Sequence, residues 1–157
     1  MASLLLRNLF FTILQPGTAA VLIPWLLLRG TGTPLVPDNW NALHFIGLLL
    51  AIGGLTIMMI CIWRFPSEGQ GTISPVDPTR KLVTGGLYRY SRNPIYVGVT
   101  ILLLGEAIYF WSWRLVVYAV LLFIGFHIWV LFHEEPRLRR VFGAEYDEYS
   151  ARVHRWI

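Results

Sequence analysis

The sequence predicts an all-α fold: a polytopic membrane helical bundle with four transmembrane helices, a tight hairpin of the third and fourth, and a C-terminal amphipathic interfacial helix. Of the 157 residues, 55% are hydrophobic and only 14% are charged, which is too apolar for an ordinary soluble domain of this length. Four apolar runs come close to the roughly 20 residues with which a helix crosses the hydrocarbon core. The basic residues are distributed unevenly between the loops, which also indicates an orientation.

The four apolar runs are residues 9–28, 42–63, 94–110 and 115–132. The first contains Pro16 and Pro24, which membrane helices tolerate because neighbouring helices satisfy the freed backbone groups. A cleaved signal peptide is the alternative for this run, but the run is long for the apolar region of such a peptide. Only residues 111–114 separate the last two runs, so we expect antiparallel neighbours with Trp111 and Trp113 at the interface.

The positions of Lys and Arg predict that both termini are cytoplasmic. With the amino terminus inside, only Arg29 and Arg114 of the 13 basic residues lie outside. The cytoplasmic residues are Arg7, Arg64, Arg80, Lys81, Arg89, Arg92, Arg137, Arg139, Arg140, Arg152 and Arg155. Because these cations face anionic lipid headgroups, they account for the net charge of +4 without nucleic acid as a partner. A short chain without trafficking signals favours a prokaryotic inner (plasma) membrane.

The single membrane domain, residues 1–157, leaves two cytoplasmic segments for polar chemistry. Residues 64–93 are rich in Pro and Gly and predict an irregular loop. Residues 133–157 have apolar positions three or four apart and predict an amphipathic helix that begins near Pro136. Gly143 weakens the case for one unbroken helix, because glycine inside a helix costs about 1 kcal/mol relative to alanine.

Two common kinds of cofactor site are not expected. The glycines at 30–32 and 69–71 follow no strand, so they do not open a dinucleotide-binding unit. The four histidines are scattered, and no pair of cysteines accompanies them, so we expect no metal site.

Two motifs carry the candidate chemistry. The first is Gly86-Leu87-Tyr88-Arg89-Tyr90-Ser91-Arg92-Asn93-Pro94-Ile95-Tyr96-Val97-Gly98, directly before the third apolar run. The second is Glu134-Glu135 after the fourth run, followed by Phe142-Gly143-x-x-Tyr146-x-x-Tyr149. The ordered set, over residues 83–156, resembles the isoprenylcysteine carboxyl methyltransferase and phospholipid methyltransferase group. That resemblance implies an integral membrane enzyme that uses S-adenosylmethionine without a Rossmann domain. Asn93 departs from the pattern, because the group often has His at this position.

The resemblance implies roles for the matching residues. Those expected to bind the cofactor are Gly86, Leu87, Tyr88, Asn93, Pro94, Tyr96, Glu134 and Glu135. Those expected to be catalytic are Glu135, Arg92, which would hold an acidic acceptor, and His133, which would take a proton from an amine acceptor.

Purely structural roles for the same residues remain as alternatives. The two glutamates would also suit the start of a terminal helix, where negative charge complements the helix dipole. The tyrosines would also suit an interfacial aromatic belt. Glu106 lies within the third run and is expected to be hydrogen-bonded in the bundle or to reach the outer interface, whereas His127 is a candidate for lining a substrate tunnel.

The favoured function is transfer of the methyl of S-adenosylmethionine to a lipidic acceptor, most simply an isoprenylcysteine-type carboxylate. A carboxylate is already ionised at neutral pH, whereas the ethanolamine headgroup of a phospholipid must first lose a proton. The alternatives are such a phospholipid N-methyltransferase, an NADPH enzyme like the sterol reductases, which the sequence resembles more faintly, and a non-catalytic membrane scaffold. The expected partners are a lipidic small molecule and membrane lipids, and the oligomeric state is left open.

Overall fold

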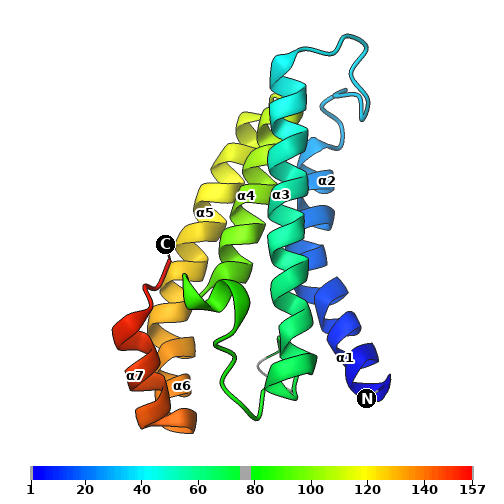
Figure 1. Cartoon of the computed structure of the whole chain (residues 1–157). Helices are drawn as coiled ribbons and strands as arrows, with labels where there is room; N and C mark the ends of the chain where they lie inside the picture. Colours follow the sequence, from blue (N-terminus) through cyan, green and yellow to red (C-terminus); the bar gives the residue numbers. More distant parts are fainter. Residues whose placement is uncertain (1, 75–78, 157) are drawn as a thin grey trace.

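The computed structural model describes residues 2–74 and 79–156, and every regular element in these ranges is helical, as predicted (Figure 1). The amino-terminal helix is α1 (Ala2–Thr12), η1 (Ile13–Leu22) and α2 (Ile23–Leu28), followed by α3 (Ala42–Arg64) with the short turn η2 (Phe65–Gly69). The second half holds η3 (Gly86–Arg89), α4 (Pro94–Tyr109), α5 (Trp113–Trp129), η4 (Val130–Glu134), α6 (Glu135–Phe142) and α7 (Ala144–Arg152).

Three continuous helices are long and apolar enough to cross a membrane: Ser3–Leu28, Ala42–Gly69 and Trp113–Phe142. By this measure of length and composition, the chain is an integral membrane protein. The remaining predicted span, α4, has 16 residues and is about 24 Å long, which is less than the roughly 30 Å of hydrocarbon. The count of four spans therefore stays a prediction.

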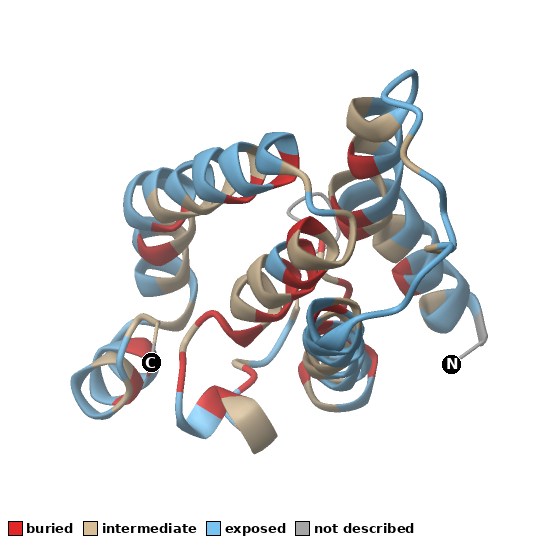
Figure 2. Cartoon of the chain, turned by 90° about the horizontal axis from the view of Figure 1, so that it is seen from above, coloured by how far each residue is buried: buried red, intermediate tan, exposed pale blue. Residues whose placement is uncertain are grey.

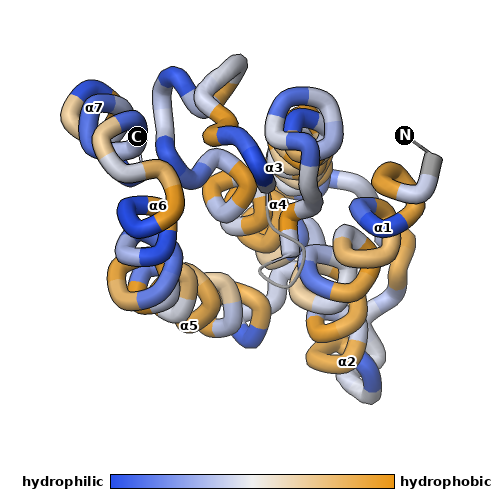
Figure 3. The backbone as a smooth tube through the Cα atoms, turned by 90° about the horizontal axis from the view of Figure 1, so that it is seen from below, coloured by the Kyte–Doolittle hydropathy of each residue, from blue (hydrophilic) through white to orange (hydrophobic). Residues whose placement is uncertain are grey.

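The apolar side chains of these helices point largely outward. Figure 2 shows exposed residues along the outer faces of the helices, and Figure 3 shows hydrophobic residues over α1 to α5. Leu49, for example, is 72% exposed and Ile13 is 65% exposed. The interior is formed mainly around α4, where Val99, Leu102 and Leu103 are buried. Outward apolar faces of this extent suit lipid, because a soluble protein rarely exposes such continuous patches.

The amino-terminal helix continues through both of its prolines. Pro16 lies inside the π-helical segment η1, and Pro24 lies in the first turn of α2. Near its start, the Asn8 side chain donates a hydrogen bond to the carbonyl of Ile62 (3.3 Å) and accepts one from the backbone N–H of Ile73 (3.3 Å). These bonds hold the amino terminus at the same end of the bundle as the loop before α4, α6 and α7 (Figure 1).

Helices α3 and α4 touch backbone to backbone through glycines. A Cβ placed on Gly54 would lie 2.3 Å from the backbone nitrogen of Leu102 and 2.6 Å from the carbonyl oxygen of Gly98. A Cβ placed on Gly98 would in turn lie 2.9 Å from the carbonyl oxygen of Gly54. Small residues at the contact let membrane helices approach closely, and Gly54, unlike its neighbour Gly53, lies at this contact.

We expect Gly54→Val to destabilise the bundle by about 1–3 kcal/mol, because its side chain would meet the backbone of α4 rather than a movable side chain. The matched control is Gly53→Val, since a Cβ on Gly53 has no atom within 4 Å. Thermal unfolding of both variants in detergent makes the comparison. Equal midpoints for the two would contradict the close contact.

The C-terminal part refines two sequence-based interpretations. The amphipathic helix predicted from Pro136 onward is present as α6, but it continues directly from the helix that begins at Trp113, and it is not one unbroken helix, because a second helix, α7, follows. Gly143, with φ at +54°, makes the break between them. The π-helical turn η4 directly before Pro136 accommodates the backbone bond that the proline ring removes. Glu134 ends η4 and Glu135 begins α6, so both lie within a continuous helix rather than at the free start of a terminal one.

The loop at residues 64–93 is more structured than its composition suggests. It contains η2 and η3, and Thr72 and Ser74 in it are buried. Its residues 75–78, which include the Pro75 and Pro78 of the predicted irregular stretch, lie outside the described residues. The described parts of the loop pack against the end of the bundle and so can form one wall of a site.

Candidate functional site

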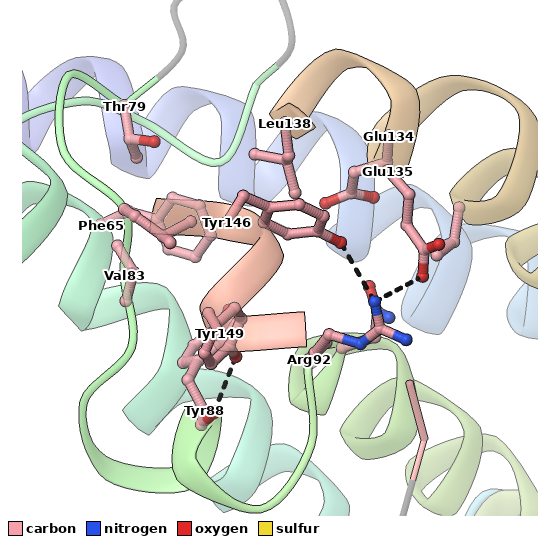
Figure 4. Close-up of a pocket in the computed structure, with 13 residues that line it drawn as sticks. Phe65, Thr79, Val83, Tyr88, Arg92, Glu134, Glu135, Leu138, Tyr146 and Tyr149 are labelled. Atoms are coloured by element: carbon pink, nitrogen blue, oxygen red, sulfur yellow. Dashed lines mark hydrogen bonds and ion pairs between the residues drawn. The ribbon is translucent and has the colours of Figure 1, made fainter. Parts of the chain in front are cut away.

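A cavity of about 60 Å³ lies where the loop before α4 meets η4, α6 and α7 (Figure 4). Five of the predicted site residues line this cavity: Tyr88, Arg92, Asn93, Glu134 and Glu135. The other lining residues are Phe65, Thr79, Leu82, Val83, Val130, Leu138, Tyr146 and Tyr149. The two motifs are thus brought to one place although about 40 residues of sequence separate them.

At one wall of the cavity, Glu135 is bound by two arginines. One carboxylate oxygen of Glu135 lies 3.2 Å from Nη1 of Arg92, and the same oxygen accepts a hydrogen bond from Nε of Arg155 at 2.7 Å. The other oxygen accepts from Nη2 of Arg155 at 3.0 Å. The side chains of Glu135 and Arg92 are only 9% and 12% exposed, so little water screens the pair. The hydrogen bond to Glu135 raises the pKa of Arg155 and keeps the guanidinium charged.

The start of α4 is set by Asn93-Pro94 and held by the C-terminal residues. Pro94 occupies the first helical position, where its missing N–H costs nothing. The backbone N–H of Arg92 donates to the carbonyl of His154 (2.9 Å), and the Asn93 side chain donates to the carbonyl of Arg155 (3.0 Å). These bonds fix the direction in which the Arg92 side chain leaves the loop.

Glu134 points to a separate partner. Its carboxylate accepts a hydrogen bond from the Tyr96 hydroxyl at 2.9 Å, and the Tyr96 ring stacks on Phe126 with 4.4 Å between centroids. Tyr96 does not line the cavity, but it orients a residue that does. The two adjacent glutamates therefore differ in their surroundings: Glu135 has two cations, and Glu134 has a phenol.

The tyrosines of α7 close the site from the side opposite α4. Tyr146 is 1% exposed and accepts a hydrogen bond from Nη1 of Arg92 (3.3 Å). Tyr149 donates from its hydroxyl to the carbonyl oxygen of Tyr88 (2.7 Å). Burial raises the pKa of the Tyr149 hydroxyl, so it stays protonated and remains a donor across the ordinary pH range. This bond joins α7 to η3.

Removing that hydroxyl, in Tyr149→Phe, should lower the free energy of unfolding by about 1–3 kcal/mol, because the buried Tyr88 carbonyl then loses its donor. Thermal unfolding in detergent measures the loss. Tyr90→Phe is the control, since Tyr90 is 73% exposed and a surface change of this kind is expected to alter stability by less than about 0.5 kcal/mol. A Tyr149→Phe midpoint as high as that of the control would show that the contact contributes nothing.

Other predicted site residues do not line the cavity. His133 is exposed and stacks on Trp129, with 4.6 Å between ring centroids. Leu87 packs against the buried cluster of Cys61, Val83 and Tyr88. Gly86 has φ at +57° and sits over the Arg64 side chain, where a Cβ would lie 2.5 Å from Nε.

The sequence did not mark Arg155, which binds Glu135 most closely, as a site residue. The one available signal is that a carboxylate buried at the end of an apolar helix requires a cationic partner. Tyr146 and Tyr149 belong to the motif quoted for the family resemblance, but the sequence assigned them no contact.

His127 and Glu106 are two polar residues within the apolar helices, and the structure shows their surroundings. His127 accepts a hydrogen bond from the Trp156 indole at 3.1 Å, so it anchors the C-terminal residues. In the described part of the chain, Oε2 of Glu106 is buried without a hydrogen-bond partner. That same part contains no group of three or more His, Cys, Asp or Glu side chains placed to hold a metal ion.

A family match covers the first motif and the Glu134-Glu135 pair. The profile of a family described as phospholipid methyltransferase matches residues 42–145, more than half of the chain. Two relatives, from Oryza sativa subspecies indica and japonica, are each named "Probable protein-S-isoprenylcysteine O-methyltransferase" and are 28% identical over 145 residues, which are 92% of this chain and 70% of each relative. No solved structure gives a significant match. The predicted resemblance is confirmed: the chain belongs to the phospholipid methyltransferase family and is a methyltransferase.

Proposed function

We propose that the protein transfers the methyl group of S-adenosylmethionine to the carboxylate of a lipidic acceptor of the isoprenylcysteine type. The observation that carries this proposal is the convergence of Arg92, Asn93, Glu134 and Glu135 on one cavity at the polar end of an apolar bundle. A polar donor reaches such a site from water, and a lipid reaches it from the bilayer.

The cavity residues fit the donor chemically. A sulfonium with ribose hydroxyls calls for carboxylates, which Glu134 and Glu135 provide, and an adenine ring packs well on aromatic side chains such as Tyr88. Ligand pockets usually enclose about 300–1,000 Å³. The cavity of about 60 Å³ must therefore widen on binding, most simply by separation of α7 from the loop before α4.

In this proposal the residues of the chain bind the methyl donor and the acceptor and align them with each other. When bound, S-adenosylmethionine supplies an electrophilic methyl carbon that is open to in-line attack. Glu134 and Glu135 would accept hydrogen bonds from the hydroxyl and ammonium groups of the donor, and the aromatic side chains of the cavity wall exclude water. Alignment alone can contribute about 7–11 kcal/mol to lowering the barrier, so no covalent intermediate on the protein is needed.

Arg92 supports an acidic acceptor. In the described part of the chain its Nε is buried without a hydrogen-bond partner, while its Nη1 is shared between Glu135 and Tyr146. A planar guanidinium with a free N–H is suited to a carboxylate. His133, the predicted proton acceptor for an amine, is exposed and lies outside the cavity lining, which favours an acceptor that needs no base.

Methylation of an ethanolamine headgroup is the second candidate, because the matching family is described as phospholipid methyltransferase. Two lipid substrates separate the candidates: a farnesylcysteine derivative with a free carboxylate, and phosphatidylethanolamine. Methyl transfer to the first alone supports our proposal, and transfer to the second alone replaces it.

The first test is calorimetric titration of the detergent-purified protein with S-adenosylhomocysteine, the demethylated donor, and in parallel with NADPH. Saturable binding of the first and none of the second is the expected result. Binding of NADPH alone would favour the reductase alternative. Binding of neither, by protein that unfolds cooperatively, would favour the scaffold.

We further propose four spans, with both termini in the cytoplasm of a prokaryotic cell. Lys81 is the one lysine of the sequence and is exposed, so an amine-reactive reagent reports its side once the modified residue is identified by peptide mass spectrometry, which separates Lys81 from the reactive N-terminal amine. Labelling should succeed in inside-out vesicles and fail in sealed right-side-out ones. A Lys81→Arg/Arg114→Lys variant moves the lysine to the other end and should reverse the result. Labelling of Lys81 from outside would overturn this topology.

A further inference from the structure

We propose that Arg155 is a positioning residue of the site, which acts by holding the Glu135 carboxylate in a fixed orientation. The inference rests on the proposed function and adds a residue to it. Arg155 is not among the residues that line the cavity, so its expected effect on a ligand passes through Glu135.

The contact between the two side chains is bidentate. Nε and Nη2 of one rigid guanidinium donate to the two different oxygens of Glu135, at 2.7 and 3.0 Å. Two parallel bonds fix the plane of the carboxylate, which a single point charge does not do. The Arg92 contact reaches only one of these oxygens, at 3.2 Å, so Arg155 rather than Arg92 determines how the carboxylate is oriented.

The backbone around Arg155 is anchored on both sides. We call residues 153–156 the C-terminal strap; it begins with extended backbone at Val153, where φ is −118° and ψ is 129°. The Arg155 carbonyl accepts hydrogen bonds from the Asn93 amide (3.0 Å) and the Ser91 hydroxyl (3.4 Å) at the start of α4.

On its other side the strap is attached to α5. The Trp156 indole donates to Nδ1 of His127 (3.1 Å), and its ring packs on Phe123 with 4.8 Å between centroids. The strap therefore connects α4 and α5 across the site and holds the Arg155 guanidinium in place. A side chain whose backbone is anchored on both sides starts from a fixed position, which is what a positioning role requires.

The test is a double-mutant cycle on S-adenosylhomocysteine affinity, measured by calorimetry on the full chain in detergent. Its four proteins are wild type, Arg155→Ala, Glu135→Gln and the double variant, with Arg155→Lys as a fifth. We expect Arg155→Ala to weaken binding about tenfold or more, and Arg155→Lys to recover only part of the loss, because lysine cannot make the bidentate contact. In the Glu135→Gln background, Arg155→Ala should change affinity by less than about twofold, since the residue acts through Glu135.

The matched control is Arg152→Ala, because Arg152 is exposed and donates to the Glu148 carbonyl of its own helix (3.3 Å). It should bind like wild type. Wild-type affinity in Arg155→Ala, full recovery in Arg155→Lys, or losses that multiply in the double variant would each overturn the inference. If Arg155→Ala does not fold, the inference is tested by the affinity of Arg155→Lys and by the comparison of Glu135→Gln with the double variant. Absence of binding by the wild type would instead defeat the proposed function.

Discussion

Glu135→Gln is expected to weaken S-adenosylhomocysteine binding by at least about 30-fold, equivalent to about 2 kcal/mol. The substitution keeps the size of the side chain but removes its charge. Arg92 and Arg155, which share this carboxylate at 3.2 and 2.7 Å, would then face each other without a counter-ion. Both guanidiniums would move, and the cavity wall formed by Arg92 and residue 135 would lose its shape. Calorimetric titration of the detergent-purified variant measures the loss.

Removing a charge elsewhere on the same end of the molecule should not change the affinity for S-adenosylhomocysteine. Glu148→Gln is the matched control, because Glu148 is an exposed glutamate on α7 and does not line the cavity. It should bind with wild-type affinity. Since breaking a buried ion pair also costs stability, about 3–5 kcal/mol in typical cases, the unfolding midpoint of Glu135→Gln must be measured first. Intact binding by a folded Glu135→Gln protein would remove Glu135 from the donor site.

Arg92→Ala is expected to lower turnover with a carboxylate acceptor by about 10- to 100-fold, because hydrogen bonds to a charged group are worth about 1.5–3 kcal/mol. In our proposal Arg92 presents its buried, unpartnered Nε to the acceptor, whereas Glu135 serves the donor. Donor affinity should therefore fall less in Arg92→Ala than in Glu135→Gln. The measurement is methyl transfer from a radiolabelled donor to a farnesylcysteine derivative, at saturating donor.

Arg89→Ala provides the comparison, since Arg89 is three residues earlier and exposed and is expected to be a headgroup anchor. Its turnover in detergent should match wild type. Equal losses of donor affinity in Arg92→Ala and Glu135→Gln would contradict the proposed division of roles. The 3.2 Å contact between the two side chains would then be better described as one donor-binding unit.

The relation between Arg92 and Glu135 also explains why two segments so far apart in sequence work together. The Arg92 backbone is bonded to His154, and the Arg92 guanidinium reaches both Glu135 on α6 and Tyr146 on α7. A change in any of these elements is therefore expected to reach the others. This coupling is the reason that each variant above is tested for both folding and binding.

Several properties of this protein are determined by the sequence alone. Apolar runs near 20 residues force helices, because lipid leaves no other way to satisfy the backbone over that length. The motif around Arg92 and the Glu134-Glu135 pair identified the family from local order and spacing. Five residues of the predicted site, among them Tyr88 and Asn93, do line one cavity.

Other properties were decided only by the tertiary structure. Local sequence suggested that Pro136 begins a helix, but the π-helical turn before it lets the helix from Trp113 continue, and this places Glu135 against the cavity. No local pattern distinguishes Arg155 from Arg152, since both are basic residues near the C-terminal end. Their difference arises because Gly143 turns α7 back beside α6 and brings one guanidinium within 2.7 Å of Glu135, while the other stays on the surface. Long-range pairing of charges depends on where chain segments meet in space, and that is not encoded in the spacing of residues along a helix.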